Sequence, residues 1–324
     1  MSAVAPKVSV GIVTYNHAPF IRECLESALA QVTDFPFEIV VGEDCSTDGT
    51  RAIVEEYAAR FPGRIRALLA EKNLGVFENW RRVLEACRGK YLANLDGDDR
   101  MRPGRLQKQV AHLDAHPDVA VLFTNLHVFD WPSGRSRGKL TPPGAPRIET
   151  LDDLVRHGMV YGHSSKMWRR SSQPLEWLPA DAPHILDWPL TIENARHGRI
   201  AFLDELLGDY RKHAAAFTAG DLIRAQAHHE EQLRTLERAR ALHGVSESAV
   251  LHAQARLIYA LAARHLAEGS FDRFRELIDS TRALPSVGPH HRFLLRLRAA
   301  PRFARAVTQA YLRLQSLRVL LAGS

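Results

Sequence analysis

The chain has 324 residues, 45% of them hydrophobic and 25% charged, a composition typical of folded globular proteins and not of disordered ones. Its net charge of +6 comes from the last third, where residues 215–324 hold 16 Lys and Arg against 9 Asp and Glu. No run of about 18 apolar residues occurs and the first residues lack a basic segment followed by an apolar one, so we expect neither a membrane span nor a secretory signal.

The first half of the chain alternates predicted strands and helices. Apolar, β-rich runs predict strands at residues 8–14, 37–43, 64–70, 90–95 and 119–129. Amphipathic segments predict helices after Pro19, at 51–61, at 76–88 and after Pro103. Because short connections join these elements, we expect an α/β fold with a mostly parallel sheet covered by helices on both faces.

The second half has a different pattern. Residues 131–147 are rich in Pro, Gly and Arg and predict a loop, and residues 150–214 mix short helices and strands. From about residue 221 the pattern is helical, with a predicted hairpin of helices around Gly269-Ser270. We therefore expect a first domain over residues 1–214 and a helical region over residues 215–324.

Polar clusters follow three of the predicted strands: TYN at 14–16, EDCSTD at 43–48 and DGDD at 96–99. In open parallel sheets, ligands bind beyond the carboxyl ends of the strands. The fold class would therefore bring these three clusters together at one edge of the sheet, although they are far apart in sequence.

The DGDD cluster has two interpretations. Asp and Gly are favoured in turns that stay in water. Three aspartates at the end of a buried strand would also suit a divalent cation, because Mg²⁺ and Mn²⁺ prefer oxygen ligands and keep substrate phosphates in their coordination shell.

The other two clusters suit the nucleoside end of such a ligand. Tyr15 is an aromatic side chain beside a strand end and could stack on a base, or it could be a packing residue. Asp44 could accept the N–H of a uracil-type ring. Asp48 is better explained as a cap of the helix that follows Gly49.

Taken together, the motifs carry a resemblance. VSVGIVTYNHAPFIRECLESAL, EIVVGEDCSTDGT, NLGVFENW, GKYLANLDGDD and RPGRLQKQV occur in this order and resemble the family 2 glycosyltransferases of GT-A fold. The resemblance covers about residues 7–214 and is most specific over 7–130. It implies an inverting transferase that uses a nucleotide-diphosphate sugar and a divalent metal.

The resemblance implies roles for the nucleotide side. Thr14, Tyr15 and Asn16 would line the nucleotide pocket, with Tyr15 against the base, and Asp44 would bind the base. The chain departs from the family at Cys45, where glycine is frequent, and we expect this difference to change the packing of the loop and not the chemistry.

The resemblance also implies a metal site for Mn²⁺ or Mg²⁺. Asp96 and Asp98 match the DxD pair, with Asp98 holding the metal and Asp96 the ribose or a metal-bound water. Asp99 would face the sugar or the acceptor. In DYRKH, Arg211 would meet the diphosphate and His213 would complete the metal shell.

For the general base, the resemblance points to the segment ILDWPL. Asp187 would deprotonate the acceptor hydroxyl during its attack on the anomeric carbon. The alternative for Asp187 is a helix N-cap before Pro189, and Asp181 and Glu193 are weaker candidates for the base. His163 is interpreted as structural or as facing the acceptor.

The expected function is transfer from a UDP-sugar to a glycan or lipid-linked acceptor in bacterial surface polysaccharide synthesis. Two alternatives are a non-catalytic nucleotide-sugar or glycan-binding protein and a metal-dependent nucleotidyltransferase, although TYNHAPF lacks the Gly-rich, basic loop expected of the latter. Three scattered cysteines favour a cytoplasmic location. The Arg-rich C-terminus could contact an anionic membrane or pack as a helical bundle, and no nucleic-acid-binding motif is visible.

Overall fold

The structure is a computed structural model that describes residues 5–172, 187–213 and 222–309. The chain divides into two compact units. Unit 1 comprises Met1–Leu154 and Gly158–Ala219, and unit 2 comprises Val155–His157 and Gly220–Ser324. Among the helices within the described ranges, none is both long and apolar enough to cross a membrane.

Unit 1 is built on one mixed β-sheet. In the part of the chain that is described, its strands run in the spatial order β3-β2-β1-β4-β8-β6-β9-β5, and β7 pairs with β6. The strands are β1 (Val8–Thr14), β2 (Phe37–Glu43), β3 (Ile65–Leu69), β4 (Tyr91–Asp96), β5 (Arg100–Met101), β6 (Val119–Asp130), β7 (Ser136–Lys139), β8 (Met167–Arg169) and β9 (Arg199–Lys212).

Parallel pairing dominates one half of the sheet. β1 is parallel to both β2 and β4, β2 is parallel to β3, and β6 is parallel to β9. The predicted α/β fold with a mostly parallel sheet is thus confirmed, and its five predicted strands are all present. The carboxyl ends of β1, β2 and β4 lie at one edge, where the three polar clusters were expected to meet.

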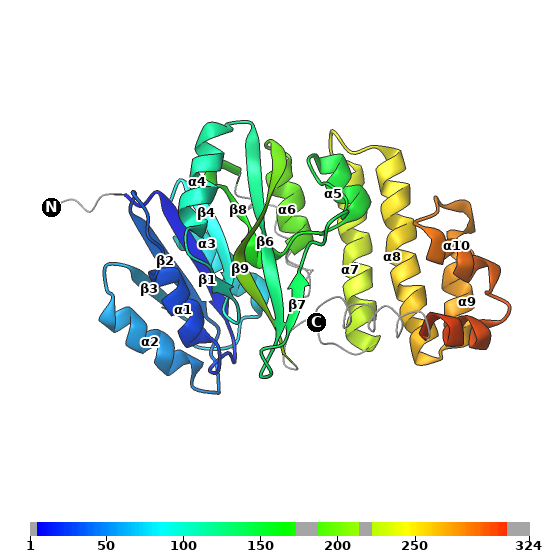
Figure 1. The fold of residues 1–324 in the computed structure, drawn as a ribbon, viewed down its shortest axis with the longest axis horizontal. Helices are drawn as coiled ribbons and strands as arrows, with labels where there is room; N and C mark the ends of the chain where they lie inside the picture. Colours follow the sequence, from blue (N-terminus) through cyan, green and yellow to red (C-terminus); the bar gives the residue numbers. More distant parts are fainter. Residues whose placement is uncertain (1–4, 173–186, 214–221, 310–324) are drawn as a thin grey trace. The chain divides into compact units, whose positions relative to one another are not determined.

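Helices cover both faces of the sheet (Figure 1). The helices of the first 213 residues are α1 (Ile21–Leu29), α2 (Thr50–Arg60), α3 (Val76–Ala86), α4 (Arg105–Ala115), α5 (Leu151–His157) and α6 (Asp187–Ala195). Apolar side chains of α1, α2 and α4 form one core with alternate residues of β1, β2 and β4. This alternation follows from the period of two along a strand, which sends successive side chains to opposite faces.

Glycine allows α3 to pack closely on the opposite face of the sheet. A Cβ atom at Gly11 would lie 3.0 Å from the Trp80 ring, and one at Gly42 would lie 2.5 Å from Asn79 Oδ1. A side chain at Gly42 would displace Asn79, and one at Gly11 would require Trp80 to shift by a few tenths of an ångström. The two glycines therefore allow the side chains of α3 to lie directly against β1 and β2.

The prediction of a loop over residues 131–147 is wrong in part. β7 lies inside this range and pairs with β6 in antiparallel fashion, as the second strand of a hairpin. β5 and β8 are also antiparallel to their neighbours; β5 was not predicted, whereas β8 lies within residues 150–214, where short strands are expected. All three strands have two to four residues, too few to produce a periodic pattern, and they depend on pairing with longer strands.

Unit 2 contains the helices α7 (Leu222–Arg240), α8 (Glu247–Glu268), α9 (Phe271–Ser280) and α10 (Pro289–Arg296). The predicted helical hairpin is present as α8 and α9. Gly269 ends α8 with a left-handed conformation, φ 88°, which glycine adopts without strain. A second apolar cluster, centred on Leu261, Phe274 and Ile278, holds these helices together.

Candidate active site

The acidic cluster lies directly against the end of β1. Gly97 N–H donates to Val13 O (3.1 Å), and the N–H of Asp99 donates to Asp96 O (3.0 Å), which closes a tight turn. A Cβ atom at Gly97 would lie 2.8 Å from the Thr14 side chain. Only glycine therefore lets the turn at residues 96–99 approach Thr14 so closely.

This turn is not the solvated turn of the first interpretation. Asp99 is 1% exposed, and the side chain of Asp98 is 18% exposed. Burying several carboxylates together is costly unless hydrogen bonds or a cation compensate. The arrangement therefore needs compensating partners, and the structure shows several.

The surroundings of Asp96 disfavour the ionised form of its carboxyl group. Its pKa is raised to about 7: burial is the largest cause, the charges of Asp98 and Asp187 add to the rise, and the hydrogen bonds with Ser164 and Asn94 oppose it. The first residue of α6, Asp187, is thus within electrostatic reach of Asp96. A divalent cation between carboxylates would remove this repulsion.

Asp98 has a histidine partner. Its Oδ2 lies 3.0 Å from His213 Nε2 at the end of β9. Burial alone would raise the pKa of Asp98, but the hydrogen bond with His213 and the nearby charge of His17 outweigh it and lower this pKa. The other ring nitrogen of His213, Nδ1, is buried without a hydrogen-bond partner. Asp98 and His213, two of the predicted metal ligands, are therefore side by side.

The chemistry of these groups fits a cation that is completed by substrate. Among the described residues, no three His, Cys, Asp or Glu side chains are grouped closely enough to hold a metal by themselves. Mg²⁺ and Mn²⁺ sites with substrate phosphates need only one or two carboxylates from the protein. Asp96, Asp98 and His213, whose Nε2 faces Asp98, have the chemistry of such a site and do not form a closed cage.

Arg211 holds the acidic turn in place through hydrogen bonds. It is 3% exposed; its Nε donates to Asp98 O (2.8 Å) and its Nη2 to Glu23 Oε2 (2.8 Å). The guanidinium also stacks over Phe20 and Phe129, at 4.8 and 5.1 Å from the ring centres. The contact of Arg211 with a diphosphate stays a prediction, and the bonds seen here hold the turn to β9.

Asp99 is tied to β9 through one carboxylate oxygen. Its Oδ1 accepts the backbone N–H of Arg211 (2.8 Å), and its Oδ2 is buried without a hydrogen-bond partner. That Asp99 faces the sugar or the acceptor stays a prediction. Burial raises the pKa of Asp99 well above its usual range, with Asp98 and Asp96 adding to the rise. The carboxyl group therefore joins the turn to β9 in the interior of unit 1.

The nucleotide-side residues lie on two linked loops. Tyr15 is 43% exposed, whereas Thr14 is buried. Asn16, at φ 55°, accepts the N–H of Thr47 (2.9 Å) and donates its own N–H to Ser46 (3.0 Å). These bonds join the loop after β1 to the loop after β2.

Asp44 is buried at the end of β2. Its two carboxylate oxygens accept the N–H groups of Leu74 (2.7 Å) and Gly75 (2.9 Å). Burial raises the pKa of Asp44 despite these bonds. Each carboxylate oxygen has a second lone pair, so a base N–H could still bind. Asp48 accepts the N–H of Thr50, the first residue of α2, and that of Ala18, so it anchors the helix start as expected.

Asp187 is the exposed first residue of α6, a position that leaves the N-cap alternative open. Its charge acts on His163 and Lys166: burial lowers the pKa of His163 to about 4 and that of Lys166 well below its usual range, and Asp187 opposes both shifts. Lys166 Nζ donates to Thr191 Oγ1 (3.1 Å), which donates to Asp187 O (2.6 Å).

Of the other candidates for the base, Glu193 is less favourably placed. It is 7% exposed and pairs at 2.6 Å with Arg196, which directly follows α6. Asp181 lies outside the described residues.

Sequence patterns missed several residues of this site. Lys166 and Arg105 are fully buried, and burial lowers the pKa of Arg105 to about 9 although Asp96 and Asp99 raise it. Arg105 Nη2 donates to Asn94 O (2.8 Å) beneath the acidic turn. Because Arg105 lies on a predicted amphipathic helix, the sequence pattern would place its charged side chain in water. Of the residues that the sequence patterns missed, His17 had the clearest signal, because it lies only three residues after Thr14.

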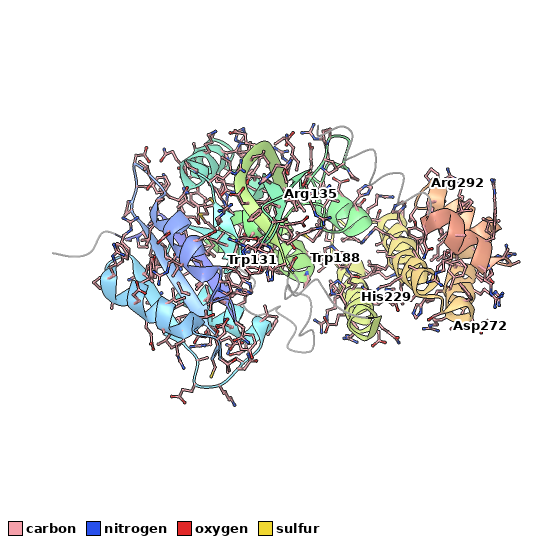
Figure 2. All side chains as sticks on the ribbon, turned by 60° about the horizontal axis from the view of Figure 1, so that its bottom comes forward. Trp131, Arg135, Trp188, His229, Asp272 and Arg292 are labelled. Atoms are coloured by element: carbon pink, nitrogen blue, oxygen red, sulfur yellow. The ribbon has the colours of Figure 1, made fainter. Side chains whose placement is uncertain are left out.

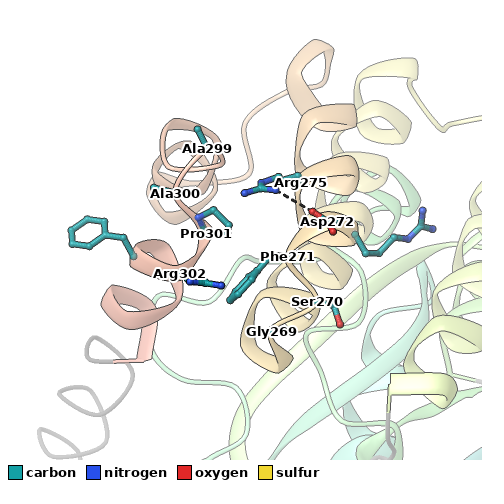
Figure 3. Close-up of a pocket in the computed structure, with 11 residues that line it drawn as sticks. Gly269, Ser270, Phe271, Asp272, Arg275, Ala299, Ala300, Pro301 and Arg302 are labelled. Carbon is teal, nitrogen blue, oxygen red and sulfur yellow. Dashed lines mark hydrogen bonds and ion pairs between the residues drawn. The ribbon is translucent and has the colours of Figure 1, made fainter.

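A separate pocket of about 850 Å³ lies in unit 2 (Figure 3). Residues of α9 and of the segment 299–303 line it, and Asp272 pairs with Arg275 there at 3.0 Å. Its only acidic side chain is thus neutralised, and no predicted site residue lines it. The acidic turn, not this pocket, has the chemistry of a reaction centre.

Comparisons with known proteins show the family of the chain. The family model described as "Glycosyl transferase family 2" matches residues 9–172. The putative glycosyltransferase EpsE of Bacillus subtilis is 34% identical over 167 residues, 52% of this chain and 58% of EpsE. The chain spans 59% of the length of the first curated relatives it matches, which are uncharacterised.

Two solved structures share the fold. TarS of S. aureus, in complex with UDP-GlcNAc, gives a TM-score of 0.62 at 22% identity and covers 93% of this chain and 87% of its own. A mannosyltransferase of Pyrobaculum calidifontis, in complex with GDP-Man and Mn²⁺, gives 0.56 at 16% identity and covers 95% and 88%.

Proposed function

Because the chain belongs to glycosyl transferase family 2, we propose that it is a metal-dependent inverting glycosyltransferase. The proposed donor is a UDP-sugar and the proposed acceptor is a hydroxyl of a glycan or lipid-linked saccharide of the bacterial cell surface. The observation that supports this proposal most is the acidic turn, whose Asp98 meets His213 and whose Asp96 is within electrostatic reach of Asp187.

In this proposal, Asp98, Asp96 and His213 hold Mn²⁺ or Mg²⁺. The bound ion would supply positive charge to the departing diphosphate. Thr14, Tyr15 and Asn16 line the nucleotide pocket, a role supported by the exposed ring of Tyr15 beside the end of β1. Two further groups complete donor binding: Asp44 accepts from the base, and Arg211 fixes the position of the turn beside the phosphates.

Asp187 is the proposed general base. The acceptor oxygen attacks the anomeric carbon, the bond from that carbon to the diphosphate oxygen breaks, and Asp187 takes the hydroxyl proton. One displacement of this kind inverts the anomeric centre. The bonds from Lys166 through Thr191 to the backbone of Asp187 support the assignment, because they fix the first turn of α6.

The C-terminal helices have a separate proposed role. Residues 1–214 would form the catalytic domain and residues 215–324 a helical region that acts at the cytoplasmic face of the plasma membrane. Its arginines and the 60% exposed Phe303 would suit an anionic lipid surface. Residues 310–324, the end of the Arg-rich segment, lie outside the described residues.

A nucleotide-release assay tests the function. Purified protein is incubated with Mn²⁺ and a panel of UDP-sugars, and released UDP is measured with and without EDTA. We expect release that EDTA abolishes and that is lost in Asp98→Ala. Binding of a UDP-sugar without any turnover would instead favour a non-catalytic binding protein, and undiminished Mn²⁺ dependence in Asp98→Ala would refute the role of Asp98.

A further inference from the structure

Trp131, labelled in Figure 2, immediately follows β6. It is 42% exposed, although tryptophan is usually a largely buried residue. Among the described residues, the large hydrophobic side chains that are exposed are Tyr15, Val32, Trp131 and Phe303. In unit 1, the exposed aromatic rings of this set are therefore Tyr15 and Trp131.

The exposed ring is held in place. The rings of Trp131 and Phe20 form a T-shaped pair, with 5.0 Å between their centres and an interplanar angle of 89°. The backbone N–H of Trp131 donates to Lys212 O (2.8 Å). A ring fixed in this way loses little freedom when a ligand binds, which favours a binding role.

A chain of contacts joins Trp131 to the acidic turn. The ring centres of Phe20 and His213 are 4.5 Å apart, and His213 Nε2 lies 3.0 Å from Asp98 Oδ2. Phe20 lies between β1 and α1, in the same segment as Tyr15. Trp131 is therefore connected to the acidic turn through the rings of Phe20 and His213.

The surroundings of Trp131 favour a polar ligand over an apolar partner. Residues 131–139 are all exposed, and after Pro132 they consist of Ser, Gly, Arg and Lys. Arg135 lies in this hairpin (Figure 2). One flat aromatic ring within polar and basic residues is not the extended apolar patch that a protein interface requires.

We propose that Trp131 is a stacking platform for a sugar ring, belonging either to the donor or to the acceptor. This inference rests on the proposed function. A pyranose ring has an apolar C–H face, and stacking it on the indole removes both surfaces from water. The indole N–H has no hydrogen-bond partner among the described residues and can donate to a ring oxygen or a hydroxyl.

The test compares Trp131→Ala and Trp131→Phe with wild type by isothermal titration in the presence of Mn²⁺. The probes are UDP, three UDP-sugars (UDP-GlcNAc, UDP-glucose and UDP-galactose) and, on the UDP-loaded protein, the corresponding methyl glycosides. Phe303→Ala, which removes an exposed aromatic ring from unit 2, is the matched control. Trp131 is a surface residue, so we expect both variants to fold.

We expect all proteins to bind UDP equally. If the stacked sugar belongs to the donor, Trp131→Ala should bind a UDP-sugar about tenfold more weakly than wild type does. If the stacked sugar belongs to the acceptor, Trp131→Ala should bind a methyl glycoside about tenfold more weakly and the UDP-sugars as wild type does. Trp131→Phe retains most of either affinity, and Phe303→Ala behaves as wild type.

Two outcomes would overturn the inference alone. Weaker binding of UDP itself in Trp131→Ala would mean that the indole stacks on the base, and unchanged affinity for every probe would mean that no sugar contacts it. Failure of the wild-type protein to bind UDP or any UDP-sugar would instead overturn the proposed function.

Discussion

Replacing Asp96 by Asn should stabilise the protein in the absence of metal while destroying its metal site. Asn has nearly the same shape and no charge. In the folded protein, burial together with Asp98 and Asp187 raises the pKa of Asp96 from its ordinary value of 3.8 to about 7. Above pH 7 the carboxylate is ionised in both the folded and unfolded states. The folded state is then destabilised, because it buries a charged group.

The size of the effect follows from the shift of the pKa. A raised folded-state pKa means that the native state binds more protons, so the contribution of this group to stability falls as the pH rises from 3.8 to about 7. Three pKa units correspond to about 4 kcal/mol. The stabilisation by Asp96→Asn should thus be about 4 kcal/mol at pH 8, falling below about 2 kcal/mol at pH 5.

Thermal unfolding in EDTA at pH 5, 6, 7 and 8 measures this difference. For a unit of about 200 residues, each kcal/mol changes Tm by about 2–4 °C. We expect a rise in Tm that grows with pH, and a loss of the further increase that Mn²⁺ and UDP give the wild type. Asp34→Asn, at an exposed aspartate whose side chain makes no hydrogen bond or ion pair within the described part of the chain, is the control and should show neither change. A lower Tm for Asp96→Asn at pH 8, or a gain independent of pH, would refute the reasoning.

Three further predictions concern the same site. Asp187→Asn should bind the donor as wild type does but lose about 10²–10⁴-fold of transfer in single-turnover assays, and full activity would place the base elsewhere. Gly97→Ala should weaken UDP binding with Mn²⁺ in calorimetry, because its Cβ would lie 2.8 Å from Thr14; Gly63→Ala, with nothing within 4 Å, is the control. Arg105→Met should lower the unfolding free energy by about 1–3 kcal/mol in urea titrations, because it leaves Asn94 O without its buried donor. An unchanged midpoint would show that another group replaces Arg105.

The sequence patterns predicted the framework of unit 1 because that framework depends on local periodicity. Apolar runs such as Val8–Thr14 and Phe37–Glu43 form strands at the residues expected, and the strands order themselves as a parallel sheet. Once a sheet of this kind is inferred, the rule that ligands bind at the carboxyl ends of its strands brings the clusters near Thr14, Asp44 and Asp96 to one edge. The short strands β5, β7 and β8 have no such local signal.

The burial of charge could not be read from the sequence. Arg105 and Lys166 have the residue types of a solvated surface, and yet both are fully buried. Their partners are distant along the chain: Arg105 meets Lys166 O, and Lys166 meets Thr191. A side chain of this kind is buried only when several elements enclose it, so its neighbours decide its position more than its own type does.

Local sequence patterns are enough to predict which segments become strands and helices, where the acidic turn lies, and which family the chain resembles. These features depend on residues within one turn or one strand of each other. The assembled fold is needed to show that Asp98 meets His213, that Asp99 bonds the backbone of Arg211 inside unit 1, and that Trp131 stays exposed beside Phe20. Such contacts join residues more than a hundred positions apart, and long-range packing, which no local pattern encodes, sets their distances and their charges.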